Sequence, residues 1–410
     1  MKKKVWIINQ YASPVGESTR QIKLSKFLTE QGYDVTVICG SKVHNQDKNL
    51  IQGKEKYRFV EFEGVNFLVV KSDNYATNGL KRILATLKFQ KNVLKVAKKL
   101  DKPDVVISDF GGLFGNKFLK FKTKYNAKFI LEILDLWPET FVDLQYLKRN
   151  SVITKILYKM EYKTYIKADK VIFSFEGGKD YIVEKKWDLG SGGKVDTDKV
   201  FYLNNGIDLD EVLFRRKNSV LEDADLTMQD FKAVYLGSIR EANNVKAIVA
   251  GAEKLKEQKV GNIKILVYGD GDKKEELEKY CLEKELDNIK FKGRLPIIYA
   301  PYVLNQCDVN IFNFEKIPLI RFGISPNKLF MYFASEKPVL STISPNYDIV
   351  KKRDCGLVVD NSGADIAAGL MQIMSMGKDR YNTFCENCKQ VAKEFDYKEL
   401  IKVLVNCIEH

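Results

Sequence analysis

The chain has 410 residues, 45% of them hydrophobic and 30% charged, which is the composition of a globular protein and, at this length, of roughly two domains. No apolar run is long enough for a transmembrane helix. The start, MKKKVWIINQ, lacks the long apolar stretch of a signal peptide, so we expect a cytoplasmic protein.

The numbers of cysteine and histidine residues and the net charge narrow the possible functions further. The seven cysteines are scattered and odd in number, which argues against a disulfide framework. The only histidines are His44 and His410, which excludes mechanisms that need a histidine base in a domain core. A formal net charge of +13 indicates an anionic partner or surface, for which we do not expect nucleic acid.

The first half alternates short apolar runs with helical patterns. A strand is predicted at 5–9, a helix at 20–31 that ends at Gly32, and a strand at 34–38. Further strands are predicted at 104–108, 128–135 and 170–174. This order predicts a parallel, doubly wound α/β sheet with helices on both faces.

A basic helix is predicted from Leu80, where apolar residues at helical spacing alternate with Lys and Arg over 81–99. Such a helix could lie on an anionic membrane. It could equally place one face in the core and leave the basic face in solvent.

A glycine-rich stretch at 187–199 marks a boundary, after which the α/β alternation returns. We therefore predict an N-terminal Rossmann-like domain at 1–198, with the terminal helix 392–410 packed back on it, and a second such domain at 199–391. Ligands bind beyond the carboxyl ends of parallel strands, so two facing domains would form a cleft between them.

The segment GISPNKLFMYFASEKPV at 323–339 reads as a loop, a helix and a strand. Ser325 is expected to cap the helix, with Pro326 in its first position and a polar first turn of Asn327 and Lys328. A helix start after a flexible Gly323–Ile324 suits a phosphate group. Met331 lies on the same face as Asn327. A capped helix that binds nothing remains an alternative.

Other loops after predicted strands carry candidate residues. Gly237 and Ser238 follow one strand, and Arg240 can clamp a phosphate. Gly269 lies in YGDGD, whose Asp270 and Asp272 spell a metal-binding pattern that we interpret as a turn. In the first half, SPVGESTR supplies Gly16 and Arg20, and DLWPE supplies Asp135.

In this order the motifs resemble glycosyltransferase family 4, whose members have the GT-B fold and retain the anomeric configuration of the sugar. The likeness spans nearly the whole chain, through DLWPE, NNGID, YLGS, YGDGD, FKGRLP and GISPNKLF. The DLWPE and SPNKLF forms look most like enzymes of bacterial surface-polysaccharide synthesis, which include capsule and O-antigen.

The resemblance implies the roles of several residues. Arg240 and Lys328 would be the catalytic cations. The donor, a nucleotide-sugar and most simply a UDP-sugar, would contact a set of loop residues, and the acceptor, a glycan or polyprenyl-diphosphate-linked sugar, would contact another. The donor set is Gly237, Ser238, Gly269, Gly323, Ile324, Ser325, Pro326, Asn327 and Met331, and the acceptor set is Gly16, Arg20, Asp109 and Asp135. No metal or cofactor is expected.

Three positions depart from the family pattern. Met331 replaces the usual acid, Gly112 stands where the branch has a histidine, and Asn243 stands near the usual lysine, with Lys246 one helical step further. These losses support an alternative, a non-catalytic relative that binds a partner transferase or a glycan. A sugar-nucleotide epimerase of the same architecture would need more histidines.

Overall fold

The computed structural model describes residues 2–15, 20–44, 46–75, 80–109 and 116–410. The chain divides into two compact units, unit 1 at 1–204 plus 397–410 and unit 2 at 205–396. In the described ranges no helix combines the length and the apolar character needed to cross a membrane.

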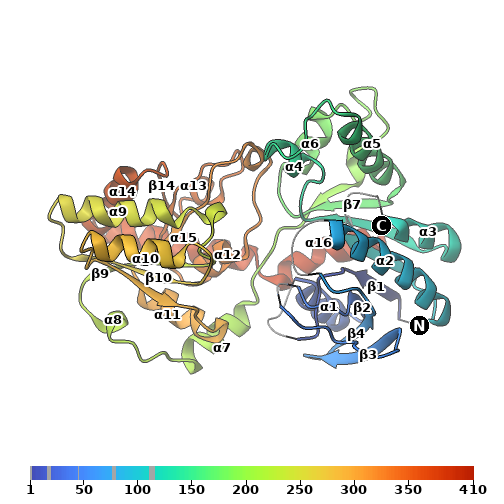
Figure 1. Cartoon of the computed structure of the whole chain (residues 1–410), viewed down its shortest axis with the longest axis horizontal. Coiled ribbons are helices and arrows are strands. Elements are labelled where there is room, and N and C mark those ends of the chain that lie inside the picture. The colour runs from blue at the N-terminus through green and yellow to red at the C-terminus, as the bar shows by residue number, and fades with distance from the viewer. Residues whose placement is uncertain (1, 16–19, 45, 76–79, 110–115) are drawn as a thin grey trace. The chain divides into compact units, whose positions relative to one another are not determined.

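Unit 1 contains an eight-stranded sheet in the order β3-β4-β2-β1-β5-β6-β7-β8 (Figure 1). All neighbouring strands pair in parallel except β3 and β4. The strands are β1 Lys4–Ile8, β2 Asp34–Gly40, β3 Tyr57–Phe62, β4 Val65–Val70, β5 Val105–Asp109, β6 Lys128–Ile133, β7 Lys170–Phe173 and β8 Val200–Tyr202.

The helices of unit 1 include one from the end of the chain. They are α1 Arg20–Glu30, α2 Leu80–Val96, α3 Lys120–Tyr125, α4 Glu139–Asp143, α5 Val152–Lys167, α6 Gly178–Glu184 and α16 Tyr397–Glu409. The last helix packs on α1, where the rings of Tyr397 and Phe27 stack with centroids 6.2 Å apart. Lys128 Nζ also donates to Ile408 O at 2.9 Å.

Unit 2 contains a six-stranded parallel sheet in the order β11-β10-β9-β12-β13-β14. The strands are β9 Phe231–Leu236, β10 Ile263–Tyr268, β11 Ile289–Gly293, β12 Val309–Phe312, β13 Val339–Ser341 and β14 Gly356–Val358. The helices are α7 Leu209–Asn218, α8 Ala224–Thr227, α9 Val245–Glu257, α10 Lys274–Glu283, α11 Ala300–Gln306, α12 Asn327–Ala334, α13 Ile349–Lys352, α14 Gly363–Ser375 and α15 Lys378–Glu394.

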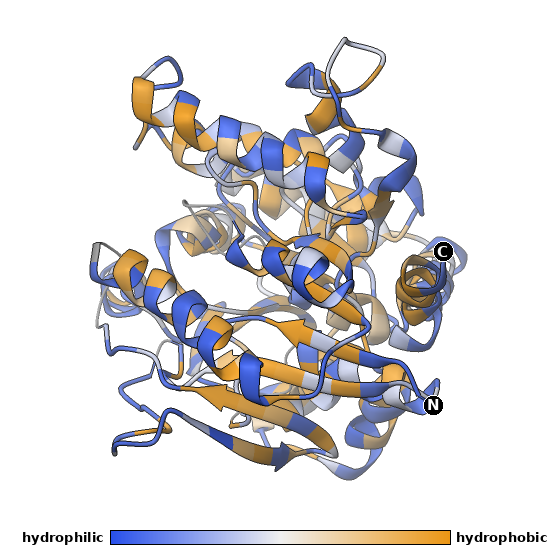
Figure 2. Ribbon diagram, turned by 90° about the vertical axis from the view of Figure 1, so that its right-hand side faces the viewer, coloured by the Kyte–Doolittle hydropathy of each residue, from blue (hydrophilic) through white to orange (hydrophobic). Residues whose placement is uncertain are grey.

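Most strands are short and largely apolar because helices cover both faces of each sheet, whereas the edge strands β3 and β11 carry charged, partly exposed residues. Figure 2 shows this as orange strands beside helices that alternate between orange and blue. In α9, for example, Val245, Ile248, Val249, Ala252 and Leu255 recur at helical spacing and are all buried. The GT-B fold class expected from the sequence is confirmed for the two parallel sheets.

Two details of unit 1 correct the sequence analysis. The expected boundary at residue 198 falls before β8, yet β8 pairs with β7 and completes the first sheet, so unit 2 begins at Asn205. The hairpin β3–β4 was not predicted. Its signal is the two-residue turn Glu63–Gly64, where both residues have positive φ (51° and 73°) between alternating apolar positions.

The basic helix predicted from Leu80 is α2. Its inner face is formed by Ala85, Phe89, Val93 and Val96, which are all at most 5% exposed. Among the described hydrophobic side chains of α2 only Leu84 is strongly exposed, at 63%. Of the two interpretations, the helix has the form of the second, with an apolar face in the core and a basic face in solvent.

Candidate functional site

In each unit the strand order reverses direction at one point, where the loops after two central strands part and leave a crevice. In unit 2 this switch point lies between β9 and β12, and in unit 1 it lies between β1 and β5. Polar side chains gather at both points. We describe the two separately, beginning with unit 2.

Lys328 is the central residue at the switch point of unit 2. It lies in the first turn of α12, and its Nζ is 3.1 Å from Asn243 Oδ1 and 3.4 Å from the carbonyl oxygen of Asn313. Aromatic rings form the rest of its surroundings, with Nζ 3.9 Å from the ring centroid of Phe314 and 4.7 Å from that of Tyr235. The Lys328 side chain, in the polar first turn that the sequence predicts, is half-buried.

The position of Lys328 changes its acidity. Burial lowers the pKa of its ammonium group to about 7, because a low-polarity site disfavours the charged form. Among the residues that the structure describes, no carboxylate forms an ion pair with it. A cation held in an apolar cage without a counter-ion is suited to bind an anion from outside.

Asn243 and Asn313 fix the walls of this cage. The amide nitrogen of Asn243 donates to Ser238 Oγ at 2.8 Å, and that of Asn313 donates to the carbonyl oxygens of Asn243 and Asn244 at 2.8 and 2.6 Å. Sequence reasoning singled out Asn243 only as a missing lysine and overlooked Asn313. The signal for Asn313 in the sequence was its position as a polar residue directly after the buried strand β12.

The helix start at α12 differs from the expected cap. Pro326 takes the N-cap position and makes no side-chain cap. The expected cap, Ser325, instead accepts hydrogen bonds from Asn205, from its backbone N–H to Oγ at 3.2 Å and from its side chain to the Ser325 carbonyl oxygen at 2.6 Å. Because Ser325 is engaged this way, the amide N–H groups of Asn327 and Lys328 have no acceptor within the described ranges.

The remaining predicted donor residues lie around this cage. Arg240 and Ser238 are exposed in the loop after β9, and Arg240 forms no ion pair with the residues described. Gly323 has φ of 98°, a conformation that favours glycine. Ile324 precedes Ser325 in the same loop, and Met331 is half-buried one turn below Asn327.

Gly269 has a structural role beside Gly237. A Cβ atom at Gly269 would lie 1.8 Å from the carbonyl oxygen of Gly237, so the two loops can approach only because residue 269 is glycine. Asp270 accepts a hydrogen bond from the N–H of Gly271, as a turn residue does. No cluster of three potential metal ligands occurs among the residues described.

At the switch point of unit 1, Asn9 follows β1 and Asp109 ends β5. Asn9 Nδ2 donates to Asp109 Oδ2 at 3.1 Å. Burial, with smaller contributions from Glu132 and Asp135, raises the pKa of the half-buried Asp109 to about 7. Asp135 is exposed after β6. Gly16 and Gly112 lie outside the described residues.

Arg20 does not face this point as a free cation. It is 8% exposed and its Nε donates to the buried Glu132 at 2.8 Å. Its other nitrogens donate to the carbonyl oxygens of Leu203 and Asn204 at 2.8 and 2.6 Å. We therefore assign Arg20 a structural role, since these bonds join α1, β6 and the segment after β8.

Sequence reasoning missed a group of polar residues after β1, β2 and β4. Gln10 Oε1, Ser13 Oγ, His44 Nδ1 and Tyr75 OH are buried and make no hydrogen bond with the residues that the structure describes. Arg82 of α2 lies over the ring of Tyr11 with its guanidinium carbon 4.9 Å from the centroid. The only signal in the sequence was that each residue follows an apolar run.

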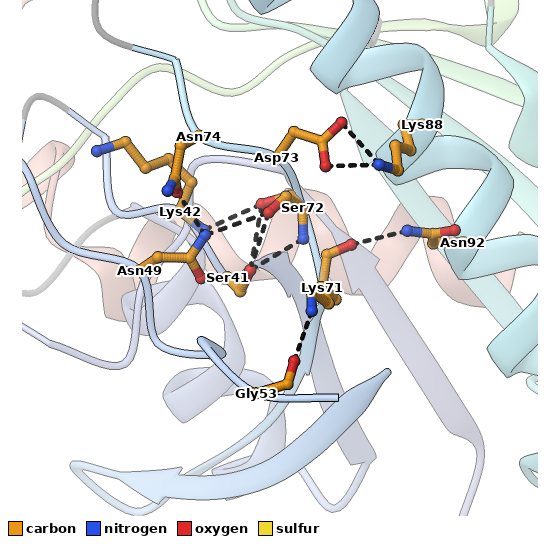
Figure 3. A network of polar contacts seen from close by, with 10 residues as sticks. All are labelled: Ser41, Lys42, Asn49, Gly53, Lys71, Ser72, Asp73, Asn74, Lys88 and Asn92. Atoms are coloured by element: carbon orange, nitrogen blue, oxygen red, sulfur yellow. Dashed lines mark hydrogen bonds and ion pairs between the residues drawn. The ribbon is translucent and has the colours of Figure 1, made fainter. Parts of the chain in front are cut away.

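A hydrogen-bond network holds the loops after β2 and β4 together (Figure 3). The Ser72 N–H donates to Ser41 Oγ at 2.9 Å, and the Lys42 N–H donates to Ser72 Oγ at 3.0 Å. Asn49 Nδ2 donates to Asn74 Oδ1 at 2.7 Å. The network fixes the loops that carry His44 and Tyr75.

Unit 2 thus places a half-buried cation, which forms no ion pair with a carboxylate among the residues described, at its switch point. Residues 220–394 match the model of the family "Glycosyl transferases group 1". The chain is 22% identical over 309 residues to "Probable glycosyltransferase WbjE" of Pseudomonas aeruginosa, a match that covers 74% of this chain and 71% of that protein.

Two solved structures are similar along their whole length. One is WaaG, "a glycosyltransferase involved in lipopolysaccharide biosynthesis", with a TM-score of 0.66, 13% identity and 99% of each chain covered. The other is Anabaena Alr3699/HepE in complex with UDP and glucose, with a TM-score of 0.64, 12% identity and 98% of each chain covered. The family match and the curated relative support a glycosyltransferase, and the two solved structures share the fold.

Proposed function

We propose that the protein is a retaining glycosyltransferase that moves a sugar from a UDP-sugar to a glycan or lipid-linked acceptor in bacterial surface-polysaccharide synthesis. The observation that carries this proposal is the half-buried ammonium of Lys328 at the switch point of unit 2, which pairs with no carboxylate among the residues described. Retention of configuration follows from the family resemblance. A similar structure that contains UDP and glucose supports the choice of donor.

In this proposal the donor diphosphate binds the Lys328 ammonium, the free amides of Asn327 and Lys328, and the guanidinium of Arg240. The charge on the diphosphate grows as the bond to the sugar breaks. Fixed donors in a water-poor site stabilise that charge strongly, because little reorganisation is needed during the reaction. The chain's own cations would stabilise the negative charge of the diphosphate leaving group, with no metal or cofactor.

Lys328 would also compensate for one departure from the family pattern. Asn243 stands near the family's usual lysine, and its side-chain oxygen is 3.1 Å from Lys328 Nζ. The ammonium group of Lys328 thus occupies the neighbourhood in which that lysine would be expected. Met331 would leave the nucleotide ribose without its usual carboxylate, which predicts a weak affinity for the nucleoside part.

The acceptor would bind at the switch point of unit 1. Asp109 and Asp135 can accept hydrogen bonds from sugar hydroxyls, and Gln10, His44 and Tyr75 offer buried polar atoms that find no partner within the described part of the chain. Buried polar groups without partners are costly unless a ligand satisfies them. A polyhydroxylated acceptor has the hydrogen-bonding groups to do so.

Calorimetric binding of UDP-glucose and other nucleotide-sugars, followed by product analysis, tests the proposal. Lys328→Ala should weaken donor binding by about 30- to 100-fold, since a charged hydrogen-bonding group is lost. Arg240→Ala should weaken it less, because Arg240 is exposed. The matched control is Lys246→Ala, which removes an exposed lysine one helical step beyond Asn243.

The proposal fails if Lys328→Ala and Lys246→Ala bind every nucleotide-sugar as the wild type does. A further variant, Met331→Glu, should strengthen binding of UDP itself by restoring a partner for the ribose hydroxyls. If the wild type binds donor and forms product in which the anomeric configuration is inverted, the retaining mechanism is wrong although the donor site stands.

A further inference from the structure

Unit 1 exposes five large apolar side chains within one short segment, from the turn after α4 to the first turns of α5. Tyr146 and Val152 are 75% and 74% exposed, and Ile153 and Ile156 are 63% and 53% exposed. Leu144 is 42% exposed. We call these five residues the α5 patch. Large apolar residues that gather on a surface mark an interaction site.

Cations surround the α5 patch. Lys148, Lys155 and Lys159 are exposed and form no ion pair with the residues described. The sequence contains no Asp or Glu from 144 to 160. On α5, Val152, Ile156, Lys159 and Lys163 follow helical spacing along one exposed face. The apolar end of that face therefore passes directly into a basic end.

The opposite face of α5 is firmly anchored. Leu157, Glu161 and Tyr165 are buried, and the Glu161 carboxylate accepts hydrogen bonds from Tyr165 OH at 2.7 Å and Tyr181 OH at 2.9 Å. The turn before α5 is held by Arg149, which donates to the buried Glu139 at 2.7 Å. The α5 patch is therefore presented on a rigid base.

Two other surfaces lack this combination. Among the side chains of the basic helix α2 that the structure describes, Leu84 alone is large, apolar and strongly exposed. In unit 2, Leu213 and Phe214 of α7 are 48% and 67% exposed, but acidic Asp210 and Glu211 precede them in the same helix. Both surfaces supply matched controls.

We propose that the α5 patch is a surface by which the protein binds the face of an anionic lipid bilayer. Apolar side chains inserted at the headgroup level, together with lysines that contact anionic headgroups, are the two requirements for binding of a helix in the membrane interface. The missing acidic residues remove repulsion from such a surface. This inference goes beyond the proposed function, because lipid binding needs neither donor nor acceptor.

The test is co-sedimentation of the full chain with phosphatidylcholine vesicles that contain or lack phosphatidylglycerol. The wild type should partition onto the anionic vesicles. Ile153→Ser with Ile156→Ser should lower the partition coefficient at least tenfold, and Lys155→Gln with Lys159→Gln should lower it comparably at low salt. UDP-glucose binding should not change in either variant, which separates this test from that of the proposed function.

The controls are Leu213→Ser with Phe214→Ser in α7, and Lys91→Gln with Lys95→Gln in α2, which should both keep wild-type partitioning. Equal partitioning of the Ile153/Ile156 variant and the wild type would overturn the proposal, as would a loss confined to the α2 variant. If the wild type instead dimerises without lipid and the Ile153/Ile156 variant is monomeric, the α5 patch is an interface between two copies and the proposal is wrong.

Discussion

The two switch points of the molecule occupy equivalent positions in similar parallel sheets but hold opposite charges. Unit 1 places the Asp109 carboxyl there, and unit 2 places the Lys328 ammonium there. Burial moves both groups toward neutrality, because it raises the pKa of the acid and lowers the pKa of the amine, each to about 7. The sheet topology thus fixes where a ligand binds, whereas the side chains decide which chemistry it meets.

The two units also use their buried cations differently. Arg20 of unit 1 donates hydrogen bonds to Glu132 and to backbone carbonyl oxygens, so its charge stabilises the packing of that unit. Among the residues that the structure describes, Lys328 of unit 2 contacts amide and carbonyl oxygens, the Tyr235 hydroxyl and aromatic rings, and no carboxylate. A cation without a buried counter-ion is the one available to a ligand.

The largest expected effect tests the structural side of this contrast. Arg20→Leu should lower the free energy of unfolding of unit 1 by about 3–5 kcal/mol, because it leaves the buried Glu132 carboxylate without its partner. Denaturant unfolding measures the change. The control is Arg58→Leu, whose pair with Glu55 is exposed and should be worth at most about 1 kcal/mol. Similar losses in both variants would contradict the structural role of Arg20.

The second prediction tests the ligand-binding side. With a pKa of about 7 in the free protein, Lys328 is protonated at pH 6 and mostly neutral at pH 8.5. Donor binding needs the protonated form, so UDP-glucose affinity should be constant below pH 7 and fall above it, by at most about tenfold per pH unit. Calorimetry over this range measures the profile and the proton uptake.

Lys328→Arg is the matched variant for that profile, because a guanidinium group stays protonated throughout the range. Its affinity for UDP-glucose should not depend on pH, although the changed geometry will alter its absolute value. A wild-type affinity that does not change between pH 6 and pH 9 would show that the ammonium of Lys328 does not contact the diphosphate.

The smallest expected effect concerns Asp109. Its pKa is raised in the folded state, so the native protein holds the proton over a range in which the unfolded chain has lost it, and stability falls as the pH rises from about 4 to 7. Asp109→Asn removes this penalty. The full shift corresponds to about 4 kcal/mol. Because Asp109 is only half-buried, solvent screens part of this, and the gain in unfolding free energy should be about 1–2 kcal/mol larger at pH 8 than at pH 4.

Thermal or denaturant unfolding at both pH values tests this prediction. Asp47→Asn serves as the control, since its side chain is fully exposed and should show no such difference. If Asp109→Asn gains the same stability at pH 4 and pH 8, the carboxyl is not held in its neutral form and the symmetry between the two switch points breaks down.

Much of the fold could be predicted because it depends on local patterns. Apolar runs followed by turn residues located β1, β2, β5, β6 and β7, since a strand buried on both faces must be almost wholly apolar. The helix that contains Lys328 and Met331 was predicted for the same reason. What failed was the pairing of short strands. The run that became β8 has only three residues, too few to show which sheet it joins.

The candidate site could be predicted less well than the fold, because it depends on contacts between distant segments. The sequence located Lys328 at a helix start and Arg240 and Asp109 near the carboxyl ends of strands, but not their surroundings. Ser325 has the chemistry of a helix cap, and only its contact with Asn205, 120 residues away in the chain, decides that it serves another bond. Arg20 reads as a free cation until Glu132, 112 residues away, is placed beside it.

The sequence by itself therefore determined the alternation of strands and helices, the loops in which functional residues lie and the resemblance to a glycosyltransferase family. Only the tertiary structure decided which of those residues remain free. Burial, pairing and the shift of a pKa depend on contacts between distant segments, and no local pattern contains them. Lys328 and Arg20 are both cations near a helix start in the sequence, and their partners alone separate a ligand site from a structural ion pair.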